Sequence, residues 1–510
     1  MIDSSIKAQI KTALFQSVYS AIQKIFEYVK DHKYLPVFYT EISNHFEYLS
    51  KAEYCHYKDE LSQGIPALKY DIPFFYTMSG GYGKSTNYGD ILETSEKEYK
   101  INCHDIKEFD ELIALLKTSK DIYDPLCSEE QHIETSVLSL VRNIVNRYIY
   151  ITKQVLDPAL DTELLNELVA ERINRLYEEI LNVNIGVPIC FINFEKDHIQ
   201  LTDTMSIDKI PYEKQLSRYN AVHFESTQES SITQCATHML KLGNYSFENT
   251  NRDSFHNATA NYWAYPLQVI DDFFASIRIS MGCKTGYGQV LIEPIGWSDN
   301  WTKDLPPIYG ANIRAFNPNE TTVKFYGYHI YDANQEDINT AINLFNIILS
   351  KRTEFSEQKK AKKSNFLFYK IFIAIDRLNR CMLRESDDDT ALDAIIGIET
   401  LLSGDTHGEI TYTISNRISV VASKLNNCPY SPQDMRRAMK SIYAFRSDIV
   451  HGRDLEKNSS IKIGGNNVLT KDLAVEFLRY SLLFIIQNQD FLNPNSFEEA
   501  LDNSLSSNIT

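Results

Sequence analysis

One short segment of the sequence carries two residues that could bind an anion and move a proton. The segment YAFRSDIVHGRD, residues 443–454, places Arg446 among apolar residues and His451 five positions later, directly before Gly452. Arginine is a permanent cation with a planar fork of donors, and histidine is the side chain that changes charge near neutral pH. The pair is therefore the first candidate for a chemical site.

The helical spacing around Arg446 sets it apart from an ordinary surface charge. Its neighbours on the same helix face are Ile442, Tyr443, Ile449 and Val450, whereas the polar side chains of the helix point elsewhere. An arginine among apolar residues needs a partner, either an internal carboxylate such as Glu399 or an external anion. Glu399 could also pair with Arg417, since apolar residues flank both. Gly452 is a natural end for the helix.

The Arg–His spacing alone does not identify a site, because the chain holds a second example. RYNAVH, from Arg218 to His223, lies in a region without a helical pattern, and we regard it as a coincidence. SGGYGKST, residues 79–86, lacks the first glycine of a phosphate loop, since Met78 is there, and a flexible loop is the better interpretation.

Two further groups could in principle hold a metal ion. The dipeptides Cys55-His56 and Cys103-His104 would give four zinc ligands, but adjacent residues rarely chelate together. The acidic run 387–389 precedes a helical pattern, and carboxylates favour the positive end of a helix dipole. We therefore expect a helix start there, and neither a metal ion nor a cofactor.

Composition limits the classes of protein to which the chain can belong. It has 510 residues, enough for two to four domains, and 43% hydrophobic residues, which favours a folded chain. Its net charge of -17 argues against nucleic acid as a partner unless positive charge gathers locally. Eight scattered cysteines, no signal peptide and no long apolar run predict a cytoplasmic protein that does not enter a membrane.

The elements that must position these residues predict an α+β multidomain chain. We expect a mainly helical N-terminal region (1–183), a central β-rich domain (184–350) with a loop insertion near 225–262, an all-α helical bundle (351–493) and a flexible tail (494–510). Four runs read as strands: VPICFINF, HIQLTD, ASIRISMG and GQVLIEPIGW. Thr406 with Glu409, and Ser431 with Pro432, predict the starts of two helices of the bundle.

Three motifs in the bundle, in this order, resemble a known family. ALDAIIGIETLL with Glu399, YTISNRISVVAS with Arg417, and YAFRSDIVHG resemble HEPN domains, in particular the ApeA-like branch of bacterial anti-phage proteins. The resemblance covers roughly residues 365–490. It implies that Arg446 and His451 are the catalytic pair of a metal-independent ribonuclease. Glu399 and Arg417 would support them, with Ser447 as the polar residue that follows the arginine and Asp448 one place later.

The chemistry implied by the resemblance needs few groups. The 2′-hydroxyl of RNA attacks its own phosphate, so a base, an acid and positive charge suffice, and the products are a 2′,3′-cyclic phosphate and a 5′-hydroxyl. The expected partners are an RNA such as tRNA, a second copy of the chain that completes a composite active site, and a phage-derived trigger. RNA would bind through basic residues before the bundle and on the motif helix: Lys359, Lys360, Lys362, Lys363, Arg436, Arg437 and Lys440.

Two other functions stay open from the sequence. A catalytically silent HEPN protein could bind RNA or a protein partner and serve in dimerisation. A nucleotide- or sugar-handling enzyme centred in the β-rich region has less support, because no motif there carries it.

Overall fold

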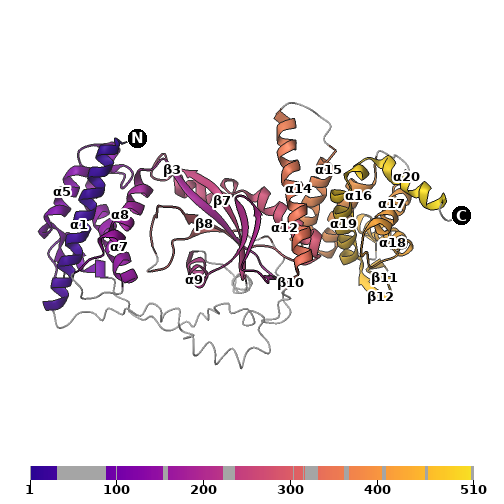
Figure 1. Ribbon diagram of the computed structural model, residues 1–510, viewed down its shortest axis with the longest axis horizontal. Helices are drawn as coiled ribbons and strands as arrows, with labels where there is room; N and C mark the ends of the chain where they lie inside the picture. Colours follow the sequence, from indigo (N-terminus) through magenta and orange to yellow (C-terminus); the bar gives the residue numbers. More distant parts are fainter. Residues whose placement is uncertain are drawn as a thin grey trace, which may run out of the picture.

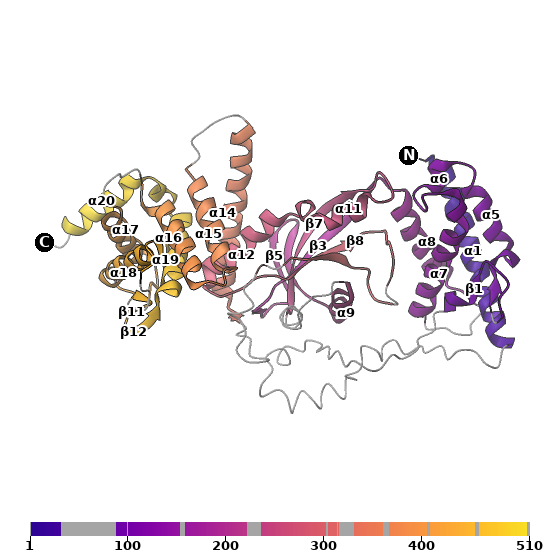
Figure 2. The ribbon, with the colours of Figure 1, turned by 180° about the vertical axis from the view of Figure 1, so that it is seen from behind.

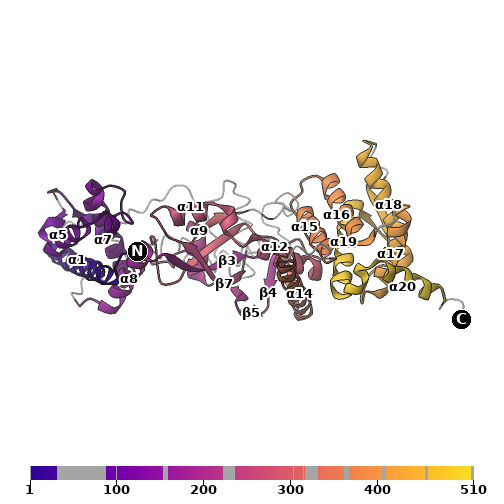
Figure 3. The same ribbon diagram turned by 90° about the horizontal axis from the view of Figure 1, so that it is seen from above.

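The protein is an elongated molecule of mixed helix and sheet, seen in a computed structural model. The structure describes residues 2–31, 88–98, 100–152, 159–221, 236–301, 304–313, 315, 331–360, 367–404, 409–453 and 458–506. A helical N-terminal part, a central sheet and a C-terminal helical bundle follow one another along the long axis (Figures 1 and 2). The view from above shows the same order, with the chain termini in the two end parts (Figure 3). None of the described helices is long and apolar enough to cross a membrane.

The N-terminal part is a helical bundle around one apolar core, as its periodicity predicted. Its main helices are α1 (Ser4–Asp31), α5 (Lys107–Leu116), α6 (Lys120–Tyr123), α7 (Ile133–Thr152) and α8 (Thr162–Tyr177). Two short strands, β1 (Leu92–Glu93) and β2 (Ile101–Asn102), pair in parallel beside them. The core joins α1, α5, α7 and α8 through buried aliphatic side chains such as Leu14, Leu112 and Ile144.

The central part is built on a six-stranded antiparallel sheet in the order β5-β6-β7-β3-β8-β9. The strands are β3 (Ile180–Pro188), β5 (His198–Thr202), β6 (Met205–Lys209), β7 (His238–Glu248), β8 (Gln289–Pro294) and β9 (Tyr309–Asn312). A separate parallel pair joins β4 (Ile192–Phe194) to β10 (Tyr331–Ala333). Two helices pack on the apolar face of the sheet: α12 (Leu267–Met281) through Phe273 and α14 (Gln335–Lys360) through Phe345. This part also contains α9 (Tyr212–Ala221) and α11 (Ser254–Ala260).

Three expectations for the central part are wrong. ASIRISMG lies in α12, where it is buried on nearly all sides, so its apolar alternation reflects a buried helix. The expected loop insertion near 225–262 contains β7, an interior strand of the sheet, and α11; residues 222–235 lie outside the described residues. Arg218 lies on helix α9, where no helix was expected, and is 3% exposed.

The C-terminal part is a bundle of helices around a second large core. It contains α15 (Tyr369–Cys381), α16 (Asp387–Leu402), α17 (Ile410–Lys424), α18 (Pro432–Val450), α19 (Thr470–Gln487) and α20 (Pro494–Ser506). The expected boundary at residue 350 falls inside α14, which continues as far as Lys360. Arg352 ties α14 to α12, because its guanidinium donates two hydrogen bonds of 2.9 and 3.0 Å to Asp272.

The bundle differs from the expected all-α domain in two places. A hairpin of β11 (Ser460–Ile463) and β12 (Asn466–Leu469) lies between α18 and α19, with a turn at Gly464-Gly465. The expected flexible tail is helix α20 up to Ser506, and it docks because Phe497 is buried in the bundle core. Thr406 lies outside the described residues, and α17 begins at Ile410 after Glu409, whose side chain makes no capping hydrogen bond.

Candidate active site on helix α18

Helix α18 carries both residues of the candidate pair, and its ends are the ones that the sequence predicts. The Ser431 hydroxyl accepts a hydrogen bond from the Asp434 amide, and Pro432 occupies the first helical position. At the other end His451 is the C-cap, and Gly452 follows with φ of 62°. That left-handed conformation favours glycine, so the helix stops directly after the motif.

Arg446 faces α16, where a carboxylate meets it. Its Nε lies 3.6 Å from Oε1 of Glu399, and the Tyr443 hydroxyl donates a 2.9 Å hydrogen bond to the same oxygen. Burial, with the nearby Glu399 charge as a second cause, raises the pKa of Tyr443, so this hydroxyl keeps its proton and remains a donor. Glu399 is therefore held between Arg446 and Tyr443. The sequence had not singled out Tyr443 as a partner, although it precedes the arginine by one helical turn.

The Glu399 contact leaves most of the Arg446 guanidinium available. The Nε atom is buried and makes no hydrogen bond, whereas the side chain as a whole is 38% exposed. Its two terminal nitrogens make no hydrogen bond within the described part of the chain. The terminal nitrogens of an arginine can donate a bidentate pair of hydrogen bonds to a phosphate. The sequence left two possible partners for Arg446, an internal carboxylate and an external anion. Arg446 could therefore contact Glu399 and bind an external anion at the same time.

His451 is exposed at the C-terminal end of α18. Its backbone amide donates a 3.1 Å hydrogen bond to the Ser447 carbonyl oxygen, so helical geometry extends to this residue. Five helical residues turn through about 500°, which separates the two side chains by about 140° around the axis. The imidazole makes no hydrogen bond with any described residue. A single chain consequently does not bring the two side chains together.

Of the four expected supporting residues, only Glu399 has its side chain in contact with the pair among the described residues. Ser447 is half-buried and provides the carbonyl oxygen that caps His451. Asp448 binds elsewhere: its Oδ2 accepts a 2.6 Å hydrogen bond from Asn458, and its Oδ1 lies 3.7 Å from Arg453. These contacts fix the chain just after the helix end.

Arg417 does not pair with Glu399, so that alternative is wrong. It is 3% exposed and donates hydrogen bonds of 2.8 and 3.2 Å to Glu498 of α20, and a 2.8 Å bond to the Leu402 carbonyl oxygen. Its guanidinium also lies 5.7 Å from the ring of Phe497. Arg417 therefore anchors the C-terminal helix to the bundle.

The structure describes only some of the basic residues expected to bind RNA. Lys440 and Arg437 are exposed on α18, and Arg437 donates a 2.6 Å hydrogen bond to Asp434. The Arg436 guanidinium lies 5.9 Å from the ring centre of the exposed Tyr412. Lys359 is exposed on α14. The side chain of Lys360 and the whole of Lys362 and Lys363 lie outside the described residues.

The other candidate sites of the sequence either have structural roles or lie outside the described residues. SGGYGKST and Cys55-His56 are outside the described residues. Cys103 is buried, which raises its pKa to about 12, and His104 bonds Asp110 at 2.7 Å and Glu134 at 3.3 Å. The run 387–389 forms the first turn of α16, as expected, and Asp387 pairs with Lys471. No group of three or more metal-binding side chains occurs in the described ranges.

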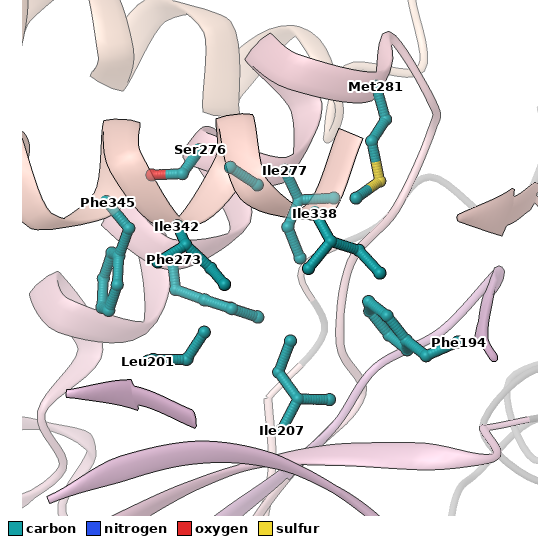
Figure 4. Close-up of a pocket in the computed structure, with 11 residues that line it drawn as sticks. Phe194, Leu201, Ile207, Phe273, Ser276, Ile277, Met281, Ile338, Ile342 and Phe345 are labelled. Carbon is teal, nitrogen blue, oxygen red and sulfur yellow. The ribbon is translucent and has the colours of Figure 1, made fainter. Parts of the chain in front are cut away.

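The central part contains a small apolar pocket between the sheet and the two helices that cover it (Figure 4). Phe194, Ile207, Phe273 and Ile338 are among the side chains that surround it, and its volume is about 10 Å³. That volume suits one water molecule at most, and the lining offers almost no polar group to hold one. The pocket is therefore a packing gap, and it lends no support to a nucleotide or sugar site.

In comparisons with protein-family models, curated proteins and solved structures, no match to this chain is found.

Proposed function

We propose that the chain is a metal-independent endoribonuclease of the HEPN type, acting in bacterial defence against phage and cleaving an RNA such as tRNA. The observation that carries the proposal is the pair on α18: Arg446, held at Glu399 with its terminal nitrogens unengaged, and His451, exposed at the end of the same helix. The order of the three motifs in the bundle supports the same assignment.

The proposed reaction needs only groups that the chain and the RNA provide. A histidine imidazole takes the proton of the 2′-hydroxyl, whose oxygen forms a new bond to phosphorus while the bond from phosphorus to the 5′-oxygen breaks. A second imidazole, in its protonated form, gives a proton to the leaving 5′-oxygen, and guanidinium charge stabilises the phosphorane. The products are a 2′,3′-cyclic phosphate and a 5′-hydroxyl. Since one helix separates Arg446 and His451 by about 140°, we propose that two chains combine to form the site.

A second function is favoured by one specific contact. The ion pair between Arg446 and Glu399 gives the arginine a purely internal partner, as a catalytically silent HEPN protein would have. Such a protein would bind RNA or a protein partner without cleaving it. The two functions predict different results for a variant without the His451 side chain: a ribonuclease would lose cleavage, and a silent protein has no cleavage to lose. The variant should stay folded, because an exposed side chain without contacts adds little to folding.

The test compares two histidine variants of the full-length protein expressed in bacteria. RNA ends are sequenced after induction of the wild type, His451→Ala and the control His132→Ala, an exposed histidine of the N-terminal part whose side chain is 57% accessible. The proposal expects new 5′-hydroxyl ends with the wild type and with His132→Ala, and none with His451→Ala. Cleavage by His451→Ala at the wild-type sites would contradict the catalytic assignment.

A further inference from the structure

A groove of about 430 Å³ lies between α18 and the hairpin β11–β12. It is lined by Asp434, Arg437, Ala438, Ser441, Asn458, Ser460, Ile461, Lys462, Ile463, Gly464 and Gly465. Its volume falls within the range of sites that hold small polar ligands or parts of larger ones. Unlike the apolar gap in the central part, this groove is lined mainly by polar groups.

The lining of the groove favours an anionic ligand. Lys462 is exposed and has no ion pair among the described residues, so its charge is available. The single carboxylate, Asp434, is already engaged, since it accepts hydrogen bonds from Arg437 at 2.6 Å and from the Ser431 hydroxyl at 2.8 Å. Ser441, Asn458 and Ser460 add neutral polar side chains that suit ribose and base edges.

The wall formed by the hairpin is held in place before any ligand binds. Ile461 and Ile463 point into the core of the bundle, which leaves Ser460 and Lys462 on the opposite face of β11. Gly464 and Gly465 have φ of 56° and 86°, as a two-residue hairpin turn requires. A Cβ on Gly465 would have no neighbour within 4 Å, so the turn leaves room for a ligand close to the backbone.

Fourteen helical residues separate Arg437 in the groove from His451, which places the two within about 40° of each other around the axis of α18. Of the α18 residues in the groove, Arg437 is exposed, Asp434 and Ser441 are half-buried and Ala438 is buried. About ten residues, or roughly 15 Å, separate Ser441 from His451 along the axis. The exposed Lys440 lies next to Ser441, and the exposed Ala444 lies between Ser441 and His451. Asn458 at the groove donates its 2.6 Å hydrogen bond to Asp448, three residues before His451. A ligand in the groove that extends along this face would therefore reach the histidine.

From these contacts we propose that the groove binds single-stranded RNA, holding nucleotides on one side of the phosphate that is cleaved. This inference rests on the proposed function, because it makes the groove a subsite of the ribonuclease. Lys462 pairs with a phosphate, the serine and asparagine side chains bind sugar and base edges, and Lys440 guides the strand toward His451.

Binding is measured separately from cleavage by placing every variant in full-length His451→Ala protein. The probe is a fluorescently labelled single-stranded oligouridylate, followed by anisotropy over a series of salt concentrations. Lys462→Glu is compared with Arg380→Glu, a charge reversal at an exposed position of α15, and Lys462→Ala serves as a milder variant. Circular dichroism confirms that each variant is folded.

We expect Lys462→Glu to weaken binding about tenfold or more. The slope of log affinity against log salt should fall by about one, as the loss of one phosphate contact requires. Arg380→Glu should bind as the parent does. Equal binding by the two charge reversals would overturn the groove as an RNA site, whether or not the wild type cleaves RNA.

Two other outcomes separate the groove from the proposed function. If Lys462→Glu abolishes binding but protein with an intact His451 never cleaves RNA, the ribonuclease proposal fails and the groove stands as an RNA-binding site. If uridine monophosphate binds as tightly as the oligouridylate, and Lys462→Glu abolishes both, the groove is a nucleotide pocket and the inference about an RNA strand is wrong.

Discussion

Replacing Arg446 by alanine should abolish RNA cleavage while costing little stability. The Arg446–Glu399 pair has its closest atoms 3.6 Å apart, and its side chains are 38% and 23% exposed, so water screens much of the attraction. Exposed pairs of this kind contribute about 0 to 1 kcal/mol. Protein domains have free energies of unfolding of about 5 to 15 kcal/mol, so a loss of about 1 kcal/mol leaves almost every molecule folded. In contrast, loss of a group that stabilises transition-state charge lowers a rate by about 10² to 10³.

The measurement combines urea unfolding with cleavage kinetics on the same protein samples. Arg446→Lys is the matched control for charge, because lysine keeps the positive charge but lacks the planar fork, and it should recover only part of the rate. Glu399→Ala should cost more stability than Arg446→Ala, since it also leaves the Tyr443 hydroxyl, in an 8% exposed residue, without its acceptor. A loss of about 3 kcal/mol or more for Arg446→Ala, or an unchanged cleavage rate, would refute the reasoning and favour the catalytically silent protein.

Three further predictions follow from the site and from the docked C-terminal helix. Mixing His451→Ala with Arg446→Ala should restore part of the cleavage that each protein lacks alone, because a composite site in a mixed dimer regains an intact copy of each residue. A strictly monomeric wild type with full activity at nanomolar concentration would contradict this. EDTA should leave the rate of RNA cleavage unchanged, since the proposed chemistry uses proton transfer and guanidinium charge. A loss of activity that magnesium restores would instead point to the acidic run 387–389. Truncation after residue 493 should lower the free energy of unfolding, measured in urea, by about 3 to 5 kcal/mol, because it exposes the site of the buried Phe497 and leaves Arg417 without its carboxylate.

Local patterns predicted the helices of the site well because their signals lie within a few residues. Ser431 with Pro432, and Gly452 after His451, define the ends of α18 through capping contacts that a short segment contains in full. The same holds for the acidic first turn of α16, where the Ser386 side chain accepts a hydrogen bond from the Asp389 amide. At these helix ends the determining interaction is local, and the sequence sufficed to predict it.

Contacts between distant segments could not be read in the same way. Arg417 and Glu399 both lie among apolar residues, which made their pairing reasonable, but Arg417 meets a glutamate 81 positions away on a helix that was expected to be a tail. Interior strand β7 was assigned to a loop because its polar second half resembles one, although neighbours on both sides hold it in the sheet. The hairpin β11–β12 had a local signal, GlyGly between alternating residues, that the expectation of an all-α bundle overlooked.

The exposure of side chains on α18 also restricts how two chains could form the proposed composite site. Ile442, one of the apolar neighbours of Arg446 on its helix face, is fully buried in the bundle core and unavailable to a partner. Val450 is 59% exposed and Ile449 half-buried, so any apolar contact made by this helix must centre on its last turn. A two-fold axis beside that turn would bring the Arg446 of one chain near the His451 of the other and leave the groove at β11–β12 open on both chains. The proposed dimer and the proposed RNA groove therefore use different faces of α18 and can coexist.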